Sequence, residues 1–188
     1  MRLVLLAAGA SRRMRGADKL LQEVDGLPLL RRQALAALAA QAGSVGVTLP
    51  PDQPLREAAL DGLPVTRLPV ADAADGMSAS LRAAARWAAG GPLLICPADM
   101  PEITASDFAT LAAAFDGTRP LRATAQDGTP GHPVVFPAAL LGLFETLTGD
   151  EGARRLLQAH PPQALPLPAS HATIDLDTPE AWAAWRSR

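Results

Sequence analysis

The sequence predicts an α/β fold in which helices cover a mainly parallel β-sheet. Short apolar runs of strand length alternate with alanine- and leucine-rich segments of helix length along the 188 residues. This alternation is typical of layered α/β proteins. Charged residues directly follow several of the predicted strands. Because ligands of open α/β sheets bind outside the carboxyl ends of the strands, we expect the functional site at that edge.

The helix ends have recognisable local patterns. Pro28 suits the first turn of a helix that Gly43 ends, Thr104 and Asp107 form a capping box, and Thr178 caps the last helix. We expect strands over residues 3–6, 45–49, 65–68, 92–95, 121–125, 133–136, 165–167 and 173–176. We expect helices over residues 28–42, 54–60, 104–115, 137–147 and 151–160, one that runs from the 76–81 segment to about residue 89, and one that starts at residue 179.

Composition limits the class of protein. The length suits one domain over residues 1–188, and the net charge of −2 gives no support for nucleic-acid or membrane-surface binding. No apolar run approaches the roughly 20 residues of a membrane span, and the start of the chain does not resemble a secretion signal. A single cysteine, Cys96, excludes an intrachain disulfide and suits a reducing compartment. We therefore expect a cytoplasmic protein with no nucleic-acid or membrane partner.

The segment from Leu6 to Lys19 is the main candidate for a ligand site. It follows the first predicted strand and contains Gly9, Gly16 and three arginines. A strand that runs into a glycine-bearing basic loop can present backbone amides and cations to phosphate. The loop fits neither the P-loop pattern nor G-x-G-x-x-G. Lys19 is the only lysine among 17 basic residues; this favours a site that needs a compact ammonium, and a surface lysine without a function is an equal alternative.

Carboxylates follow two other predicted strands. Asp99 comes after the apolar strand over residues 92–95, in a turn stiffened by a proline, where it could hold a divalent ion or bond its own backbone. Asp175 and Asp177 alternate along a predicted strand and would share one face of it. Two carboxylates on one face favour a bound cation, and capping of the following helix is the alternative.

Two further segments carry polar groups that a ligand could use. The segment over residues 76–80 turns into a helix, so its free amides and serine hydroxyls could hold a phosphate, base or sugar. Ordinary N-capping by Ser78 is the alternative. His132 lies between a flexible loop and a strand and could contact an acceptor. A lone histidine is more often structural, and no second His or Cys lies nearby in the sequence for a zinc site.

Six segments together resemble the MobA-like nucleotidyltransferases and, within them, the branch that contains molybdenum cofactor cytidylyltransferase. They are L-A-A-G-A-S-R-R-M (6–14), G-M-S-A-S-L (76–81), D-M-P (99–101), G-H-P (131–133), G-D-E-G-A-R (149–154) and I-D-L-D-T-P-E (174–180). They follow one another in the family's order. The resemblance implies one nucleotidyltransferase domain over residues 1–188. It also implies a three-layer sandwich on a Rossmann-like, mainly parallel sheet, as in nucleotide-diphospho-sugar transferases.

The resemblance also implies an activity. It is the transfer of CMP from CTP to a phosphorylated acceptor, with Mg²⁺ as cofactor and release of pyrophosphate. The first choice of acceptor is the molybdenum cofactor (molybdopterin), because L-A-A-G rather than L-A-G-G is similar to the cytidylyl branch. A molybdoenzyme of the xanthine dehydrogenase type is the protein partner that the resemblance suggests.

Residue roles carry over from the family by position. The resemblance implies a catalytic group of Arg13, Lys19 and Asp99. It implies nucleotide binding by Leu6, Ala7, Ala8, Gly9, Arg13, Lys19, Gly76, Ser78 and Ser80. It implies metal binding by Asp99 and Asp177, with Asp175 as the alternative second carboxylate, and acceptor binding by His132. This interpretation requires Lys19, Asp99 and Asp177 to meet around one metal-bridged triphosphate.

The chain departs from the family pattern at Arg15, where many members have glycine directly after the methionine. The departure moves Gly16 one position along and changes the register of the expected phosphate contacts. Two other classes of function stay open. One is an oxidoreductase linked to NAD(P)H, against which the missing G-x-G-x-x-G argues. The other is a non-catalytic carrier or chaperone for the molybdenum cofactor.

Overall fold

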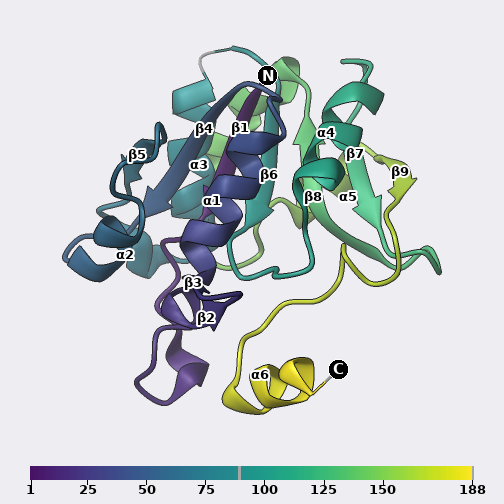
Figure 1. The fold of residues 1–188 in the computed structure, drawn as a ribbon. Coiled ribbons are helices and arrows are strands. Elements are labelled where there is room, and N and C mark those ends of the chain that lie inside the picture. The colour runs from purple at the N-terminus through teal and green to yellow at the C-terminus, as the bar shows by residue number, and fades with distance from the viewer. Residues whose placement is uncertain (89, 188) are drawn as a thin grey trace.

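The computed structural model describes residues 1–88 and 90–187, and a seven-stranded sheet forms its centre (Figure 1). The strands lie in the order β5-β4-β1-β6-β8-β7-β9, and within this sheet β8 runs antiparallel to both of its neighbours while the other pairs are parallel. The strands are β1 (Arg2–Leu6), β4 (Ser44–Leu49), β5 (Thr66–Pro69), β6 (Leu93–Pro97), β7 (Leu121–Thr124), β8 (Pro130–Phe136) and β9 (Gln163–Pro166).

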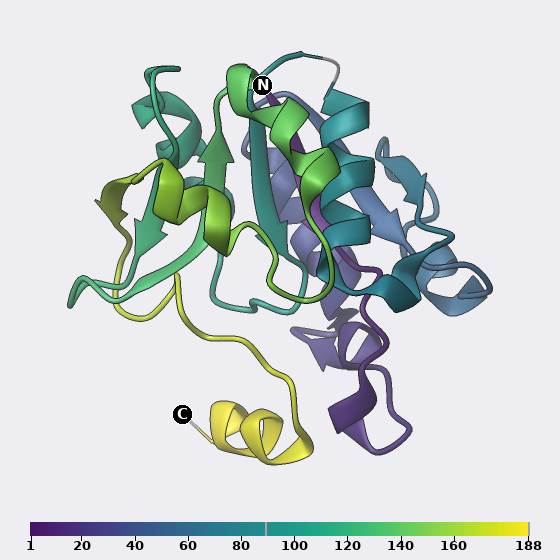
Figure 2. The same ribbon diagram turned by 180° about the vertical axis from the view of Figure 1, so that it is seen from behind.

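Helices cover both faces of the sheet, as the two opposite views show (Figures 1 and 2). One face carries α1 (Leu29–Ala39) and α4 (Ala105–Ala114), with α2 (Pro54–Ala59) near the β5 edge. The other carries α3 (Met77–Ala88), the 3₁₀ segment η4 (Ala138–Thr146) and α5 (Arg154–Ala159). The predicted three-layer α/β sandwich with a mainly parallel sheet is confirmed. Among the described residues no helix is long and apolar enough to span a bilayer.

The central strand β1 shows why the sheet needs two covering layers. Leu3 and Leu5 are fully buried in the cluster on the α1 and α4 side, whereas Val4 is fully buried in the cluster under α3 and η4. Neighbouring side chains of a strand point to opposite faces, so an unbroken apolar run requires an apolar layer on each side. The two layers leave the carboxyl end of β1 as the place where the chain can meet a ligand.

A smaller group of elements lies below that end of the sheet. It comprises the 3₁₀ turns η1 (Arg12–Met14) and η2 (Lys19–Leu21), the hairpin of β2 (Glu23–Val24) and β3 (Leu27–Pro28), and the C-terminal helix α6 (Pro179–Arg186). Figures 1 and 2 both show α6 at the same end of the molecule as η1. Met14, Val24, Leu176 and Trp182 share one buried apolar cluster there. This cluster brings the segment that contains Asp177 next to the basic loop.

Most predicted strands and helices are confirmed with their ends moved by one to three residues, and the predicted capping box at Thr104 and Asp107 is present. The predicted end of α3 at residue 89 lies outside the described residues. The strand predicted over residues 173–176 is wrong. The amides of Thr173 and Ile174 donate to the Ser170 carbonyl in a turn, at 3.0 and 3.2 Å, so they are not available to a sheet ladder.

Candidate active site

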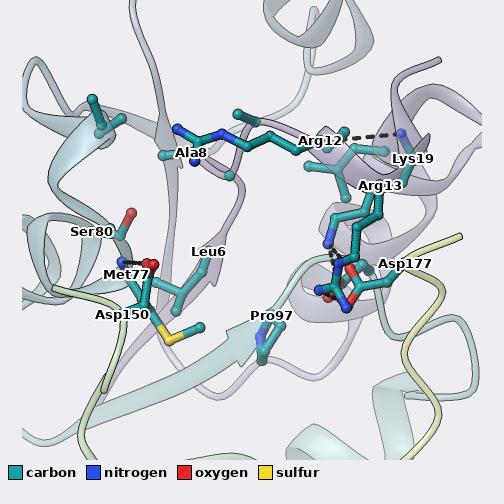
Figure 3. A pocket seen from close by; sticks show the side chains of 18 residues that line it. Leu6, Ala8, Arg12, Arg13, Lys19, Met77, Ser80, Pro97, Asp150 and Asp177 are labelled. Atoms are coloured by element: carbon teal, nitrogen blue, oxygen red, sulfur yellow. Dashed lines mark hydrogen bonds and ion pairs between the residues drawn. The ribbon is translucent and has the colours of Figure 1, made fainter. Parts of the chain in front are cut away.

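The candidate active site is a pocket of about 590 Å³ at the carboxyl ends of β1 and β6 (Figure 3). In Figure 3 Arg13, Lys19 and Asp177 lie on one side of it. Met77, Ser80 and Asp150 lie on the other. Its lining comprises Leu6, Ala8, Gly9, Ala10, Ser11, Arg12, Arg13, Lys19, Leu20, Ala73, Ala74, Gly76, Met77, Ser80, Pro97, Asp99, Asp150 and Asp177.

Most residues with a predicted nucleotide or metal role line this pocket. Of the predicted set, Ala7, Ser78, Asp175 and His132 are not among its lining residues. Ala7 and Ser78 are buried behind the wall, and the Ser78 amide donates to the Gly149 carbonyl at 3.1 Å. Ser78 lies inside α3 rather than at its N-cap, so the alternative of capping by Ser78 is wrong.

A buried arginine that the sequence did not single out holds the basic loop in shape. The Arg56 guanidinium donates to the carbonyls of Ala7 and Gly9, at 2.6 and 2.8 Å, and pairs with both oxygens of Asp18. The Arg56 side chain is 3% exposed. Turning the loop away from β1 leaves carbonyls without ladder partners, and Arg56 satisfies them. The Ala7 amide likewise donates to Thr48 Oγ1 at 3.0 Å.

Lys19 joins two carboxylates that are distant in sequence. Its ammonium donates to Asp177 Oδ1 at 2.6 Å and to Asp99 Oδ2, and Arg13 pairs with the second oxygen of Asp177. Burial acts to lower the pKa of Lys19. The charges and hydrogen bonds of Asp99 and Asp177 outweigh it and raise that pKa above its usual value. The side chain at position 19 therefore stays cationic over the physiological range.

Asp99 has an oxygen that no described residue satisfies. It lies in the turn after β6, it is 7% exposed, and its Oδ1 is buried without a hydrogen-bond partner among the described residues. Buried polar atoms in native proteins almost always have a partner. An unpartnered carboxylate oxygen in the wall of a pocket is a position for a ligand, and hard divalent cations prefer such oxygens. Asp99 and Asp177 therefore fit a divalent cation.

Two carboxylates and no third donor define the kind of metal site. Among the described residues no group of three or more His, Cys, Asp or Glu side chains is placed to hold a metal ion. Mg²⁺ is commonly bound by one or two carboxylates together with water and substrate phosphates. The Asp175 side chain reaches solvent but is partly desolvated. This desolvation, followed by the negative charges of Asp177 and Asp99, raises the pKa of Asp175. Because residues 173–176 form no strand, Asp175 and Asp177 do not share a strand face as predicted.

The wall opposite Lys19 depends on a glycine. Gly76 has a φ of +96°, and a Cβ there would lie 2.4 Å from Asp150 Oδ1 and 2.7 Å from the backbone of Gly149. The Met77 amide donates to the same Asp150 oxygen at 3.2 Å. Only glycine combines this conformation with so close an approach. Asp150 belongs to the segment over residues 149–154, which stood out in the sequence only for its resemblance to the family.

His132 lies outside the pocket that contains Lys19. It lines a neighbouring pocket on the same side of the sheet as α5, together with Arg122 and Arg154. Burial, and then the positive charge of Arg122, lower the pKa of His132 to about 4, so the imidazole is neutral near pH 7. Arg154 belongs to the G-D-E-G-A-R segment (149–154) of the family resemblance, whereas nothing in the sequence pattern singled out Arg122.

The fold and the charged pocket at the carboxyl ends of β1 and β6 define a nucleotide-binding α/β protein of the nucleotidyltransferase class. Residues 3–164 match the MobA-like NTP transferase domain, and the chain belongs to this family. The family that the sequence motifs resemble is thus confirmed.

Solved structures with the same fold cover the whole chain. A homologue of Rv0371c from Mycobacterium sp. strain JC1 is 27% identical, with a TM-score of 0.85 over 99% of this chain and 94% of that one. Rv0371c of Mycobacterium tuberculosis H37Rv is 25% identical, with a TM-score of 0.84 over 100% and 98%. A further structure of that protein is a complex with manganese, at 23% identity and a TM-score of 0.79 over 97% and 96%.

A more distant neighbour is a CMP:2-keto-3-deoxy-manno-octonic acid synthetase complexed with CTP. It is 16% identical, with a TM-score of 0.72 over 98% of this chain and 96% of that one. At that identity the likeness shows a shared fold.

Proposed function

We propose that the protein transfers CMP from CTP to a phosphorylated acceptor, with the molybdenum cofactor (molybdopterin) as the first choice. The observation that carries the proposal is that Lys19, Asp99 and Asp177 meet at one pocket. In the sequence Asp99 follows Lys19 by 80 residues and Asp177 follows it by 158. Such a group of one cation and two carboxylates suits a metal-bridged triphosphate. The L-A-A-G form of the loop and the CTP complex of a protein with the same fold support cytidine.

The reaction needs no covalent intermediate with the protein. A phosphate oxygen of the acceptor forms a bond to the α-phosphorus of CTP. The bond from that phosphorus to the bridging oxygen breaks, and pyrophosphate leaves with the electron pair. Catalysis of this kind consists mostly of positioning and of stabilising negative charge.

The described residues divide that work. Lys19 and Arg13 neutralise charge on the triphosphate and the leaving pyrophosphate, while the backbone at Ala8 and Gly9 and the 76–80 segment hold the nucleoside. Asp99 and Asp177 would hold a divalent cation, which supplies Lewis acidity at the phosphates when bound. The manganese complex of Rv0371c supports a divalent ion in this proposal, and Mg²⁺ is the ion we expect.

A nucleotide-binding profile tests the proposal. Thermal shifts and calorimetry against the four NTPs, with and without Mg²⁺, should give the largest effect for CTP with Mg²⁺. Pyrophosphate should then appear when a molybdopterin-type acceptor is added. Release with another phosphorylated acceptor alone would keep the class and reject molybdopterin. Cofactor binding without pyrophosphate would support a carrier, and NAD(P)H oxidation would support an oxidoreductase; either result contradicts the transferase.

A further inference from the structure

A second pocket of about 410 Å³ adjoins the candidate active site. Leu6, Met77 and Asp150 line both pockets, so the two cavities share a wall. The rest of the second lining is mostly apolar, with two arginines and a histidine at one part of it. Its other lining residues are Leu81, Ile95, Arg122, His132, Val134, Phe136, Glu151, Gly152, Ala153, Arg154, Leu157, Gln158 and Pro162.

The second pocket contains positive charge without a counterion. Among the described residues neither Arg122 nor Arg154 forms an ion pair. Burial, and then the like charge of Arg154, lower the pKa of Arg122. Arg122 is partly buried and Arg154 is exposed, so an anion bound between them would relieve the repulsion between their like charges.

The acidic residues of the same lining have other partners. Asp150 accepts a hydrogen bond from the Met77 amide at 3.2 Å. Glu151 pairs at 2.6 Å with Arg155, four residues further along the chain, rather than with Arg154. The charge of Glu151 is thus balanced within its own pair, whereas Arg122 and Arg154 stay available to a negatively charged ligand.

His132 adds an uncharged polar group to the two arginines. Its Nδ1 is buried and has no hydrogen-bond partner among the described residues. An imidazole that stays neutral near pH 7 can donate one hydrogen bond and accept another. A buried ring atom without a partner, in the wall of a pocket, indicates a ligand group that supplies the partner.

We propose that this second pocket binds an organic phosphate whose organic part packs against an apolar wall, with Arg122 and Arg154 on the phosphate oxygens. Guanidinium groups bind phosphate with paired, charge-assisted hydrogen bonds. The wall formed by Ile95, Val134, Phe136 and Leu157 would bury one face of that organic part. Identifying this ligand with the acceptor rests on the proposed function, because the shared wall places it beside the nucleotide. The binding chemistry of the pocket does not depend on that function.

Phenyl phosphate is a suitable probe, because it combines a phosphomonoester with a small apolar ring. We would titrate it into the full chain by calorimetry and ligand-observed NMR, beside inorganic phosphate and phenol. We expect Arg154→Ala to weaken phenyl phosphate binding about tenfold or more, because a charge-assisted hydrogen bond is lost. The control is Arg67→Ala, since Arg67 is exposed, pairs with Asp61 and lines neither pocket. This control should bind as the unchanged chain does.

Several results would overturn the inference. One is equal binding by the Arg154→Ala and Arg67→Ala variants, provided that Arg154→Ala melts at the temperature of the unchanged chain. Another is competition between phenyl phosphate and CTP, which would place the probe in the first pocket. Equal affinities for inorganic phosphate and phenyl phosphate would show that the apolar wall contributes nothing to binding. Arg122→Lys is a second test and should also weaken phenyl phosphate binding. Lysine is chosen over alanine because Arg122 also donates to the Gly131 carbonyl, and its truncation would disturb β8.

The same measurements separate this inference from the proposed function. Loss of CTP binding in Asp99→Ala together with loss of phenyl phosphate binding in Arg154→Ala supports both. A chain that binds phenyl phosphate through Arg154 but does not bind CTP with Mg²⁺ keeps the anion pocket and contradicts the transferase. A chain that releases pyrophosphate while Arg154→Ala changes nothing keeps the transferase and contradicts the pocket.

Discussion

Asp18 and Lys19 are consecutive in the chain, yet they belong to two ion-pair groups of opposite character. Asp18 pairs with Arg56, whose guanidinium makes five hydrogen bonds to Asp18, Ala7, Gly9 and Ser11. Lys19 pairs with Asp99 and Asp177, and Asp99 keeps an oxygen without a partner among the described residues. The first group is saturated and the second is not.

The difference separates framework from binding site. A saturated group of charges has no remaining donor or acceptor for a ligand, and it holds the backbone of the loop in place. An unsaturated group in a pocket has already lost water from its charges, so it interacts strongly with a ligand of matching charge. Breaking the Arg56 group should therefore reduce stability first, and breaking the Lys19 group should reduce activity first.

The largest effect is expected from Asp99→Asn. The amide keeps the shape of the side chain but removes a negative charge that the proposed metal site requires. We expect kcat to fall by about a thousandfold or more, since most of the barrier reduction in phosphoryl transfer comes from charge placement. Pyrophosphate release would measure it, with the melting temperature as a check on folding. Glu180→Ala, which removes an exposed pair with Arg15, is the control. Turnover of the Asp99→Asn variant within tenfold of the unchanged chain would exclude Asp99 from the metal site.

The second effect is on stability. Arg56→Ala leaves the part-buried Asp18 carboxylate and two loop carbonyls without their partner, and we expect unfolding to become easier by about 3–5 kcal/mol. Arg67→Ala removes an exposed pair with Asp61 and should cost less than about 1 kcal/mol. Urea unfolding of the two variants makes the comparison. Equal midpoints would contradict the framework role of Arg56.

The third effect concerns pH. The folded pKa of His132 is about 4 against 6.5 for the free side chain, so the unfolded chain binds the proton more readily. The stability contributed by neutral His132 is complete above pH 6.5 and is lost as pH falls toward 4, by about 3 kcal/mol in total. The carboxylates also titrate in this range, so the measurement is the difference between the unchanged chain and His132→Gln. Parallel pH profiles for the two would contradict it.

The sequence predicted the parts of this comparison that depend on local pattern. Lys19 stood out as the only lysine, and Asp99 stood out because it follows a buried strand. Their separation of 80 residues is closed by the order of strands, because β1 and β6 are neighbours in the sheet. The carboxyl ends of parallel neighbours lie at one edge, so the meeting of the two side chains follows from the topology.

Other parts depend on contacts that no local pattern marks. Arg56 lies in a six-residue helix and is no different in sequence from an exposed arginine, and it is buried because the loop carbonyls face it. Arg122 and Arg154 come together only because β7 and α5 flank the same pocket. The strand predicted over residues 173–176 is wrong because an alternating apolar and polar pattern does not specify the hydrogen-bond partners of the backbone. Here the first two amides of the segment donate to a turn carbonyl rather than to a neighbouring strand.

The smallest effect is a test of the choice of cation in each group. Lys19→Arg keeps the charge but replaces a compact ammonium with a planar fork, and we expect kcat/KM to fall about tenfold with little change in unfolding free energy. Arg56→Lys should do the reverse, because three donors replace five and the loop carbonyls lose partners. Unfolding should become easier by about 2 kcal/mol, while kcat/KM per folded molecule stays within about threefold. The two exchanges leave the net charge unchanged. If they moved activity and stability by the same amounts, the distinction between a saturated and an unsaturated group would be wrong.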